Sequence, residues 1–281
     1  MQDATPKTPN VTVIVSARER FSLAIRSLNA LISATQEPYG LIYIDAGSPK
    51  GVASELKRIC AEQGFTYHRI DHYLSPAQSR NRGHHMASTK YVAFVENDVF
   101  VADNWLTPLI ECAEQTGAEV VQPLICQGAP LHSEIHHGGG NFTNDFDGFF
   151  NGPVDARRLA DRHFLHQGKQ VGDVALARSE TQVCETHCML VRRDTFDEKM
   201  PYSKDHVDFS ISVWANGGRI MLEQTSIATV CHPDSAHPLE AMDLPLFILR
   251  WSPKWQRESL DYFRKKWGLQ ADPYFDKYAK Q

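Results

Sequence analysis

The sequence predicts an α/β protein with a mostly parallel β-sheet and helices on both of its faces. Short runs rich in β-branched and aromatic residues recur through the first 123 residues, and such runs are typical of strands buried on both faces. Segments with apolar residues at helical spacing separate these runs. Alternation of this kind implies right-handed crossovers between parallel strands. At 281 residues, with 42% hydrophobic and 22% charged residues, the chain can bury a substantial core.

In the first half, strands are expected at 11–15, 41–44, 65–70 and 91–95, and helices from 21 to 36, 52–62 and 75–88. The first helix follows from apolar residues at helical spacing between Phe21 and Ile32, and the Glu37-Pro38 pair favours its end. Gly64 is placed to end the second helix. The fourth run, Tyr91 to Val95, is the strand around which we expect the rest of the chain to be organised.

The second half is less regular. A helix at 105–113 and a strand at 119–123 are followed by a stretch from 125 to about 178 with no sustained period. We interpret this stretch as a loop that folds over a ligand, with 138–140 as its flexible part. Its adjacent histidines His136 and His137 would diverge on a strand and so make no ready chelate. Order returns in a strand at 185–191, a helix at 205–215 and a strand pair at 219–223 and 226–231.

Charge and composition exclude several classes of protein. The net charge of −5 gives no electrostatic case for a nucleic-acid partner. Six scattered cysteines favour reduced thiols over a disulfide framework or a zinc site. No apolar h-region follows Met1, and no window approaches a membrane span. These features predict a soluble, cytoplasmic protein without a transmembrane segment, with peripheral contact at the inner face of the membrane left open.

The fourth strand stops abruptly at Glu96, Asn97 and Asp98. Carboxyl ends of strands in an open α/β sheet are where ligands bind. Carboxylate and amide oxygens can hold a hard divalent cation, which can in turn hold a diphosphate. The alternative is that Asp98 only caps the next helix or ends a turn.

Four motifs in order resemble glycosyltransferase family 2, whose fold is GT-A. They are V-T-V-I-V-S-A-R-E-R from Val11, I-D-A-G-S from Ile44, S-R-N-R-G from Ser79, and V-E-N-D from Val95. The resemblance runs from Val11 to about Gly268 and implies a single domain over 1–281. Its parts would be a nucleotide-sugar-binding half at 11–123, an acceptor-binding and catalytic half at 124–240, and a helical tail at 241–281.

The resemblance also implies a set of donor-binding residues and a metal site. Ser16, Arg18, Asp45, Arg80, Asn81, Glu96 and Asn97 would contact the nucleotide-sugar, and Asp98 and His232 would hold Mn²⁺ or Mg²⁺. Some of these residues have a structural alternative: that Asp45 accepts only turn hydrogen bonds, that Arg80 and Arg82 lie on a solvated helix face, and that His232 is a lone structural histidine.

In the second half, E-T-H-C-M-L-V-R-R from Glu185 resembles the family's strand before the acceptor-side helix. Glu185 and His187 share one face of that strand and are either acceptor-binding residues or satisfied polar groups beneath the acceptor. D-H-V-D-F-S-I-S-V from Asp205 resembles the family's E-D-x-D segment, with His206 in place of the usual general base. Inversion at the anomeric carbon requires a base for the acceptor hydroxyl. Asp205 is the first candidate, ahead of Asp208 and His206, although Asp205 could be a helix cap and Asp208 part of a salt bridge.

The function that the resemblance implies is an inverting, metal-dependent glycosyltransferase. It would move a sugar from a nucleotide-diphosphate sugar, expected to be a UDP-sugar, to a saccharide or lipid-linked glycan in cell-surface polysaccharide synthesis. Aromatic and basic residues at 247–251 and 262–267 either pack the tail on the core or dock on a membrane. The alternatives are a sugar-phosphate nucleotidyltransferase, disfavoured because S-A-R-E-R-F lacks a glycine, and a catalytically silent nucleotide- or sugar-binding module.

Overall fold

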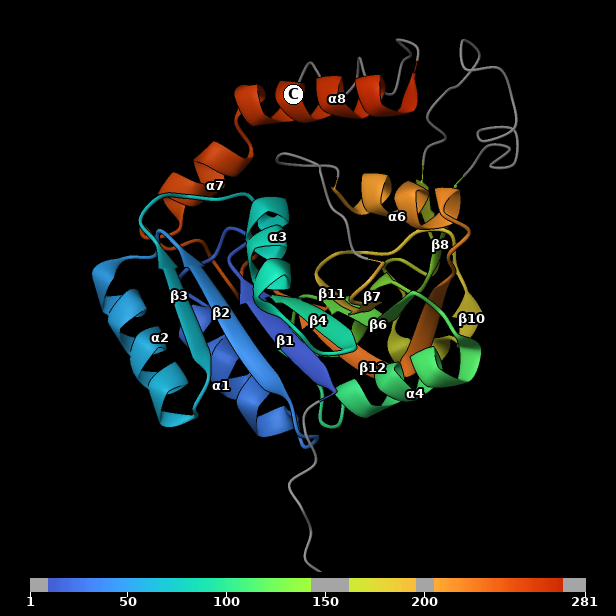
Figure 1. Cartoon of the computed structure of the whole chain (residues 1–281), viewed down its shortest axis with the longest axis horizontal. Coiled ribbons are helices and arrows are strands. Elements are labelled where there is room, and N and C mark those ends of the chain that lie inside the picture. The colour runs from blue at the N-terminus through green and yellow to red at the C-terminus, as the bar shows by residue number, and fades with distance from the viewer. Residues whose placement is uncertain (1–9, 143–161, 196–204, 270–281) are drawn as a thin grey trace, which may run out of the picture.

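The structure is a computed structural model that describes residues 10–142, 162–195 and 205–269. Its centre is a mixed sheet of ten strands in the order β10-β12-β6-β11-β4-β1-β2-β3, with β5 paired to β12 and β7 to β6. Helices cover both faces of this sheet (Figure 1). The predicted α/β class is therefore confirmed.

The N-terminal half is a parallel sheet with helical crossovers. Its strands are β1 (Val11–Ser16), β2 (Gly40–Ala46), β3 (Thr66–Ile70) and β4 (Tyr91–Glu96), and its helices are α1 (Ala24–Ala34), α2 (Lys50–Glu62) and α3 (Pro76–Met86). Strand β1 pairs in parallel with β2 and β4, and β2 with β3. Each of these elements lies within a few residues of its predicted position.

The C-terminal half continues the sheet with mixed directions. Its elements are β5 (Val99–Val101), α4 (Leu106–Thr116), β6 (Val120–Gln127), β7 (Glu134–His137), β8 (Gly140–Phe142), β9 (Arg162–Phe164), a 3₁₀ turn (Val171–Asp173), β10 (Ser179–Glu180), β11 (Cys188–Arg192), α6 (Asp205–Ala215), β12 (Ile220–Val230), α7 (Leu244–Arg250) and α8 (Pro253–Trp267). Strand β11 is antiparallel to both β4 and β6, and it joins the two halves of the sheet.

Two predictions for this half were wrong. The expected strand pair at 219–223 and 226–231 is one strand, β12, whose register shifts between Glu223 and Ile227 where it pairs with β6. The shift accommodates extra residues, which the sequence pattern presents as a turn. The stretch from 125 to 178 carries β7 to β9 and the 3₁₀ turn where it is described, so it is more ordered than expected. Residues 143–161 of that stretch lie outside the described residues.

The core has two layers because side chains alternate across each strand. On one face, Val13 and Val15 of β1 pack with α1, α2 and α4. On the other face, Ile14 packs with β2, β4, β11 and the helix α6. Helix α3 lies so close to β1 that a Cβ on Gly83 would come within 2.4 Å of Ile14 Cγ2. This close approach sets the distance between α3 and the strand ends.

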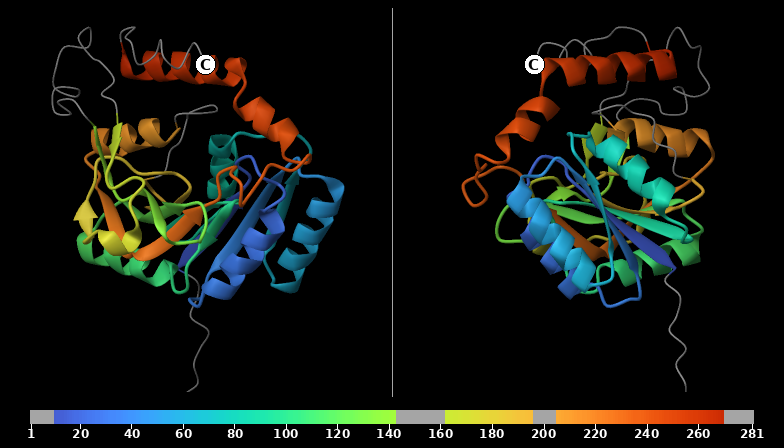
Figure 2. Two further views of the ribbon diagram at one scale, coloured as in Figure 1. Left: turned by 180° about the vertical axis from the view of Figure 1, so that it is seen from behind. Right: turned by 60° about the vertical axis from the view of Figure 1, so that its left-hand side comes forward.

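Helices α7 and α8 lie across the end of the molecule where the parallel strands terminate (Figures 1 and 2). Leu260 and Phe263 of α8 pack against Val207 and Ile211 of α6. Leu246 of α7 packs against Ala17 and Phe21, which follow β1. The tail thus closes over the strand ends, as expected for aromatic residues that pack on a core.

Candidate functional site

Buried charged residues gather at the carboxyl ends of β1, β2 and β4. Three of them follow β1, namely Arg18, Glu19 and Arg20, and all are at most 6% exposed. The others are Asp45, Arg80, Glu96, Asp98, Glu185, His187, Asp205 and Arg250, none more than 9% exposed. Charged groups are rarely buried in such numbers unless they pair with one another or bind a ligand.

Glu96, the last residue of β4, lies at the centre of this group. Its Oε2 accepts a hydrogen bond from His187 Nδ1 at 2.6 Å and lies 3.3 Å from Arg18 Nε. Its Oε1 lies 3.6 Å from Arg80 Nη1. Burial holds the pKa of Glu96 well above its usual range despite the neighbouring arginines. With one histidine and two arginines around it, Glu96 is placed to orient its neighbours.

Asp98 is fully buried. Neither of its carboxylate oxygens has a hydrogen-bond partner among the described residues, and its nearest cation is Arg18 Nη1 at 3.9 Å. Burial raises the pKa of Asp98, and the charges of Glu96 and Glu19 raise it further against the effect of Arg18. A buried carboxylate with unmet acceptors is costly unless something binds it. Its backbone carbonyl accepts a hydrogen bond from Cys231 N at 3.0 Å, which ties it to the chain before His232.

Asp45 is the next-to-last residue of β2, and its side chain fixes the turn that follows the strand. Its Oδ1 accepts a hydrogen bond from Ser48 N at 3.1 Å, and its Oδ2 accepts from Arg69 Nη1 at 2.8 Å and from the Tyr67 hydroxyl. Gly47 completes the turn with φ of 83°, a conformation that favours glycine. Asp45 thus accepts turn hydrogen bonds while lying at the end of a strand.

Two arginines enter the site with unmet hydrogen-bonding capacity. Arg18 donates from Nη1 to Glu19 at 2.8 Å. Arg250, at the end of α7, lies with Nε 3.2 Å from Glu19 Oε2, which also accepts a hydrogen bond from Trp251 Nε1 at 2.9 Å. Arg18 Nε and Arg250 Nε and Nη1 are buried without a hydrogen-bond partner within the described part of the chain. Buried guanidinium groups of this kind are suited to a phosphate.

Three histidines from separate segments meet at the side of this group. They are His136 on β7, His187 before β11 and His232 after β12, and one ligand atom from each lies within 4.8 Å of the others. Their ring centroids are 5.2 to 5.7 Å apart. Burial lowers the pKa of His232 to about 2, and it lowers the pKa of His187 well below its ordinary value. These two imidazoles are therefore neutral and can donate lone pairs.

Arg20, a residue that the sequence analysis did not select, holds the segment around His232 through hydrogen bonds to its backbone. Arg20 donates from Nη1 to the carbonyls of Cys231 and His237, at 3.3 and 3.1 Å, and from Nη2 to the carbonyl of Pro238 at 2.9 Å. Its Nε lies 3.4 Å from Asp243. These bonds hold the loop that carries His232 against the strand ends.

Asp205, the first candidate for a base, forms a buried ion pair with Arg80 of α3. Burial would raise the pKa of Asp205, but the charges of Arg80 and Arg250 outweigh it and lower that pKa below its ordinary value. A carboxyl with a lowered pKa is a weak base. His206 lies beside it, with Nδ1 4.0 Å from Asp205 Oδ1 and Nε2 3.9 Å from Glu185 Oε1.

Asp208 points away from this group, toward the tail. Its carboxylate accepts hydrogen bonds from Lys266 Nζ and Trp267 Nε1, both at 2.6 Å. Burial nevertheless raises its pKa. These contacts match the salt-bridge interpretation of Asp208, since they join α6 to α8.

The remaining predicted donor residues divide between the loop and the helix. Asn97 holds the loop after β1, because its side chain accepts a hydrogen bond from Arg18 N at 3.2 Å and donates to Arg20 O at 2.9 Å. Ser16 is buried and accepts a hydrogen bond from Asn97 N through its carbonyl. On α3, Arg82 is exposed and Asn81 half-buried.

Sequence reasoning missed Glu19, Arg250 and His136 as members of the site. His136 and His137 do diverge, as expected, because His137 turns inward to Gln122 at 2.7 Å. No sequence pattern indicates that the fold brings His136 close to His187 and His232, which are distant in the chain. Arg250 lies in the C-terminal tail, and the only sequence feature that pointed to it was its position between the aromatic residues Phe247 and Trp251.

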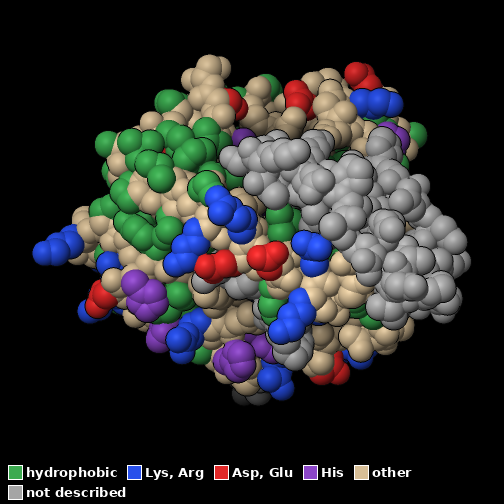
Figure 3. Space-filling model, turned by 90° about the horizontal axis from the view of Figure 1, so that it is seen from above, with side chains coloured by type: hydrophobic (Ala, Val, Ile, Leu, Met, Phe, Trp, Pro, Cys, Tyr) green, Lys and Arg blue, Asp and Glu red, His purple; other side chains and the backbone are tan. Residues whose placement is uncertain are grey.

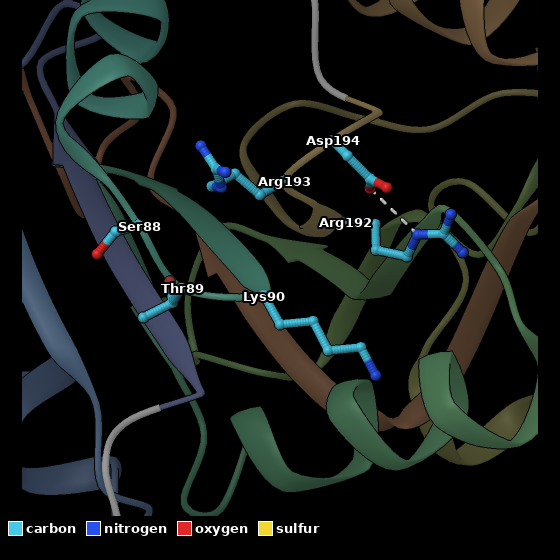
Figure 4. A pocket seen from close by; sticks show the side chains of 6 residues that line it. All are labelled: Ser88, Thr89, Lys90, Arg192, Arg193 and Asp194. Atoms are coloured by element: carbon cyan, nitrogen blue, oxygen red, sulfur yellow. Dashed lines mark hydrogen bonds and ion pairs between the residues drawn. The ribbon is translucent and has the colours of Figure 1, made fainter.

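A separate pocket of about 410 Å³ lies away from these residues, beside the start of β4 and the end of β11 (Figure 4). Ser88, Thr89, Lys90, Arg192, Arg193 and Asp194 line it. Three of its four charged side chains form ion pairs, since Lys90 contacts Glu114 at 2.6 Å and Arg192 contacts Asp194 at 3.2 Å. The pocket holds none of the predicted site residues.

The fold is of the GT-A type. Solved structures support this: GalNAc-T7 with UDP, GalNAc and Mn²⁺ matches 97% of this chain and 57% of its own, with a TM-score of 0.61 and 15% identity. TarS of S. aureus, residues 1–349 with UDP-GlcNAc, matches 96% of this chain and 70% of its own, with a TM-score of 0.59 and 12% identity. At these identities the likeness shows the fold.

The model of Glycosyl transferase family 2 matches residues 12–198. The chain belongs to this family. A putative polypeptide N-acetylgalactosaminyltransferase 13 of Drosophila melanogaster is 27% identical over 235 residues, which are 76% of this chain and 40% of the relative. An uncharacterized glycosyltransferase of Rickettsia bellii is 29% identical over 105 residues, which are 37% of this chain and 15% of the relative. The chain thus spans less than half the length of these curated relatives.

None of the helices in the described ranges is long and apolar enough to cross a membrane.

Proposed function

We propose that the chain is a glycosyltransferase that uses a UDP-sugar as donor and a glycan hydroxyl as acceptor. The observation that carries the proposal is the buried cluster at the ends of β1, β2 and β4, where guanidinium groups with unmet N–H donors lie beside carboxylates and histidines. Ligands of open α/β sheets bind at this edge. Family membership and the two solved neighbours with UDP or UDP-GlcNAc support the choice of donor.

The donor would lie along this edge from β2 toward α7. Asp45, fixed by Ser48 and Arg69, would accept hydrogen bonds from uracil or ribose. Arg18 and Arg250 would bind the diphosphate, because their buried N–H groups match its oxygens. Burial, together with the charge of Arg18, lowers the pKa of Arg250, so an anion placed between the two would relieve their mutual repulsion.

A divalent cation would supply charge to stabilise the leaving diphosphate. The residues present fit such an ion, because Asp98 has two buried oxygens without hydrogen-bond partners in the described ranges and His232 lies with two further histidines. Glu96 is less suited as a ligand, since His187, Arg18 and Arg80 already surround its carboxylate. The sequence-based choice of Asp98 and His232 stays a prediction.

For transfer with inversion, the acceptor hydroxyl needs a base. We propose His206 as this base in place of Asp205, because Arg80 lowers the pKa of Asp205 and Lys266 forms an ion pair with Asp208. An imidazole has an ordinary pKa close to neutrality. Glu185, 3.9 Å from His206 Nε2, would then orient the ring or stabilise its protonated form.

The acceptor is proposed to be a saccharide, free or lipid-linked. Helix α7 contributes Arg250 to the site and exposes Leu244 and Ile248 by 43% and 65%, and Trp251, directly after the helix, is 50% exposed. Hydrophobic side chains gather on the face viewed from above, where α7 and α8 lie (Figure 3). A lipid-linked acceptor would therefore reach the site beside an apolar surface. Flotation with liposomes tests this: the double variant Leu244→Ser and Ile248→Ser should lose binding that the wild type shows, and equal flotation of the two would reject it.

Turnover of a donor panel tests the activity itself. Purified protein is incubated with UDP-GlcNAc, UDP-GalNAc, UDP-Glc and UDP-Gal in the presence of Mn²⁺, and UDP release is followed with and without glycan acceptors. We expect acceptor-stimulated release from one donor, and the anomeric configuration of the product, read by NMR, decides between inversion and retention. A folded protein that binds UDP but releases none would be a catalytically silent binding module.

His206→Ala and Arg82→Met form a matched pair for the base. His206→Ala should lower kcat by roughly 10²-fold or more if the imidazole takes the proton, while Arg82→Met, on the exposed side of α3, should leave kcat within about twofold. Equal rates for the two variants would remove His206 from the mechanism.

A further inference from the structure

Glu19 is buried between two arginines that reach the strand ends from opposite ends of the chain. It follows β1 and is 1% exposed. Its Oε1 accepts a hydrogen bond from Arg18 Nη1 at 2.8 Å, and its Oε2 lies 3.2 Å from Arg250 Nε. The same Oε2 accepts a hydrogen bond from Trp251 Nε1 at 2.9 Å. One carboxylate thus joins the loop after β1 to the end of α7.

The rest of the chain holds the two guanidinium groups unequally. Arg18 is fixed by the strand ends, because its backbone N–H donates to Asn97 Oδ1 at 3.2 Å and its Nε lies 3.3 Å from Glu96 Oε2. Arg250 is the last residue of α7, and its ion pair with Glu19 is the only one that the described ranges show for it. The position of the Arg250 guanidinium therefore depends on Glu19.

Electrostatic repulsion between the two arginines increases this dependence. Burial lowers the pKa of Arg250, and the charge of Arg18 lowers it further, against the effect of Glu19. Like charges repel strongly where water is excluded. Helix α7 lies at the surface, with Ile248 65% exposed. Without a carboxylate between the arginines, the Arg250 side chain would therefore turn away toward solvent.

Both guanidinium groups keep N–H donors that Glu19 does not use. Arg18 Nε and Arg250 Nε and Nη1 are buried and have no hydrogen-bond partner within the ranges that the structure describes. Because a single carboxylate bridges the two groups, their separation is limited to its width and two short contacts. Guanidinium groups held in this way suit the oxygens of one diphosphate.

We propose that Glu19 is a positioning residue, whose carboxylate holds Arg18 and Arg250 together as a pair for the donor diphosphate. It acts through the arginines and touches no part of the donor. The inference rests on the proposed function, from which it takes the diphosphate as ligand, and it adds that the tail must contact Glu19 for the pair to form.

The sign of one effect distinguishes positioning from charge. A carboxylate that acted only through its charge would repel the diphosphate, so its removal would tighten binding. Positioning predicts that binding weakens. Glu19→Gln removes the charge, and its amide N–H groups would face the donors of the tail. Glu19→Asp keeps the charge, but its side chain is one CH₂ group shorter and cannot reach both arginines.

Inorganic pyrophosphate is the probe, since it carries a diphosphate without nucleoside or sugar. Its Kd is measured by calorimetry on the whole chain in the presence of chelator. We expect Glu19→Gln and Arg250→Met each to raise this Kd by roughly tenfold or more, and Glu19→Asp by about three- to tenfold. The double variant Glu19→Gln and Arg250→Met should lie within about threefold of the weaker-binding single variant, because the two residues act as one unit.

Two exposed residues of α8 provide matched controls, Glu258→Gln and Arg257→Met. Each should change the Kd for pyrophosphate by less than about twofold. Thermal unfolding identifies the variants that fold. If Glu19→Gln does not fold, Glu19→Asp decides, since it retains the buried charge.

Tighter or unchanged pyrophosphate binding in the folded Glu19 variants would overturn the proposal. Effects of Glu19→Gln and Arg250→Met that multiply in the double variant, or a wild type that binds no pyrophosphate, would overturn it as well. If the expected pattern is found but no UDP-sugar is turned over, the positioning role stands and the proposed function fails. Turnover of a UDP-sugar with equal pyrophosphate affinities for wild type and Glu19→Asp would keep the function and reject the role of Glu19.

Discussion

The ion pair between Arg80 and Asp205 provides a sharp test of how the site is held together. The Arg80 side chain is 1% exposed and the Asp205 side chain 6%, and Arg80 also lies 3.6 Å from Glu96. Arg80→Met keeps much of the volume and removes the charge, which leaves two buried carboxylates without this partner. Removing one member of a buried pair costs about 3–5 kcal/mol. We expect the free energy of unfolding at pH 7 to fall by that amount.

Urea unfolding, monitored by circular dichroism, measures the loss, and Arg82→Met serves as control. Arg82 lies two residues away on the same helix but is exposed, so its removal should change the free energy of unfolding by less than about 0.5 kcal/mol. The same pair of variants separates charge from helix propensity, because both replace arginine by methionine on α3.

The pH dependence has a definite sign. Arg80 and Arg250 hold the pKa of Asp205 below its ordinary value, so this carboxylate contributes stability that is present above the unfolded pKa of about 3.9 and is lost as pH falls through the folded pKa. Arg80→Met lacks the contribution of Arg80, so the difference between the two proteins should be largest near neutrality and shrink toward pH 3. A loss below about 1 kcal/mol at pH 7, or a loss that grows on acidification, would refute the reasoning.

Two further predictions concern the turn at β2 and the contact of α3 with β1. Gly83→Ala should lower the free energy of unfolding in urea by about 1–3 kcal/mol, because the added Cβ would lie 2.4 Å from Ile14 Cγ2. The control Gly51→Ala has open space around it and should raise this free energy by up to about 1 kcal/mol. An unchanged free energy of unfolding in Gly83→Ala would contradict the close packing of α3 on β1. Asp45→Asn should raise the Kd for UDP by roughly 10- to 150-fold, equivalent to a charged hydrogen bond of about 1.5–3 kcal/mol. Asp71→Asn, 91% exposed on the other side of Arg69, should change that Kd by less than about threefold in calorimetry, and equal values for both variants would place uracil and ribose elsewhere.

The parallel half of the fold could be predicted because its signals are local. Buried strands such as Tyr91–Glu96 and amphipathic helices such as α1 can be recognised from the residue pattern of short sequence windows. The single strand β12 was not, because its register shift depends on pairing with β6 and β5, which are distant in sequence. Strand β5 itself has three residues, too few for a period to be read.

The site was predictable where it lies at strand ends and not where it depends on the tail or on side-chain orientation. Asp45 and Glu96 lie at the carboxyl ends of β2 and β4, and Asp98 follows β4, so all three lie at the expected edge of the sheet. Arg250 reaches Glu19 only because α7 folds back over β1. Likewise, the ion pair of Asp205 with Arg80 depends on the distance between α6 and α3, which no motif encodes.

The donor site is the basis of the proposed function, and one measurement tests it most directly. Calorimetric titration of UDP, GDP, CDP and dTDP into purified protein, each with Mn²⁺ and with chelator, compares the wild type with Asp45→Asn. We predict that UDP binds most tightly, that chelator weakens its binding, and that Asp45→Asn weakens it further. Failure of all four nucleotides to show metal-dependent binding to the folded protein would contradict the account and leave family membership as a statement about the fold.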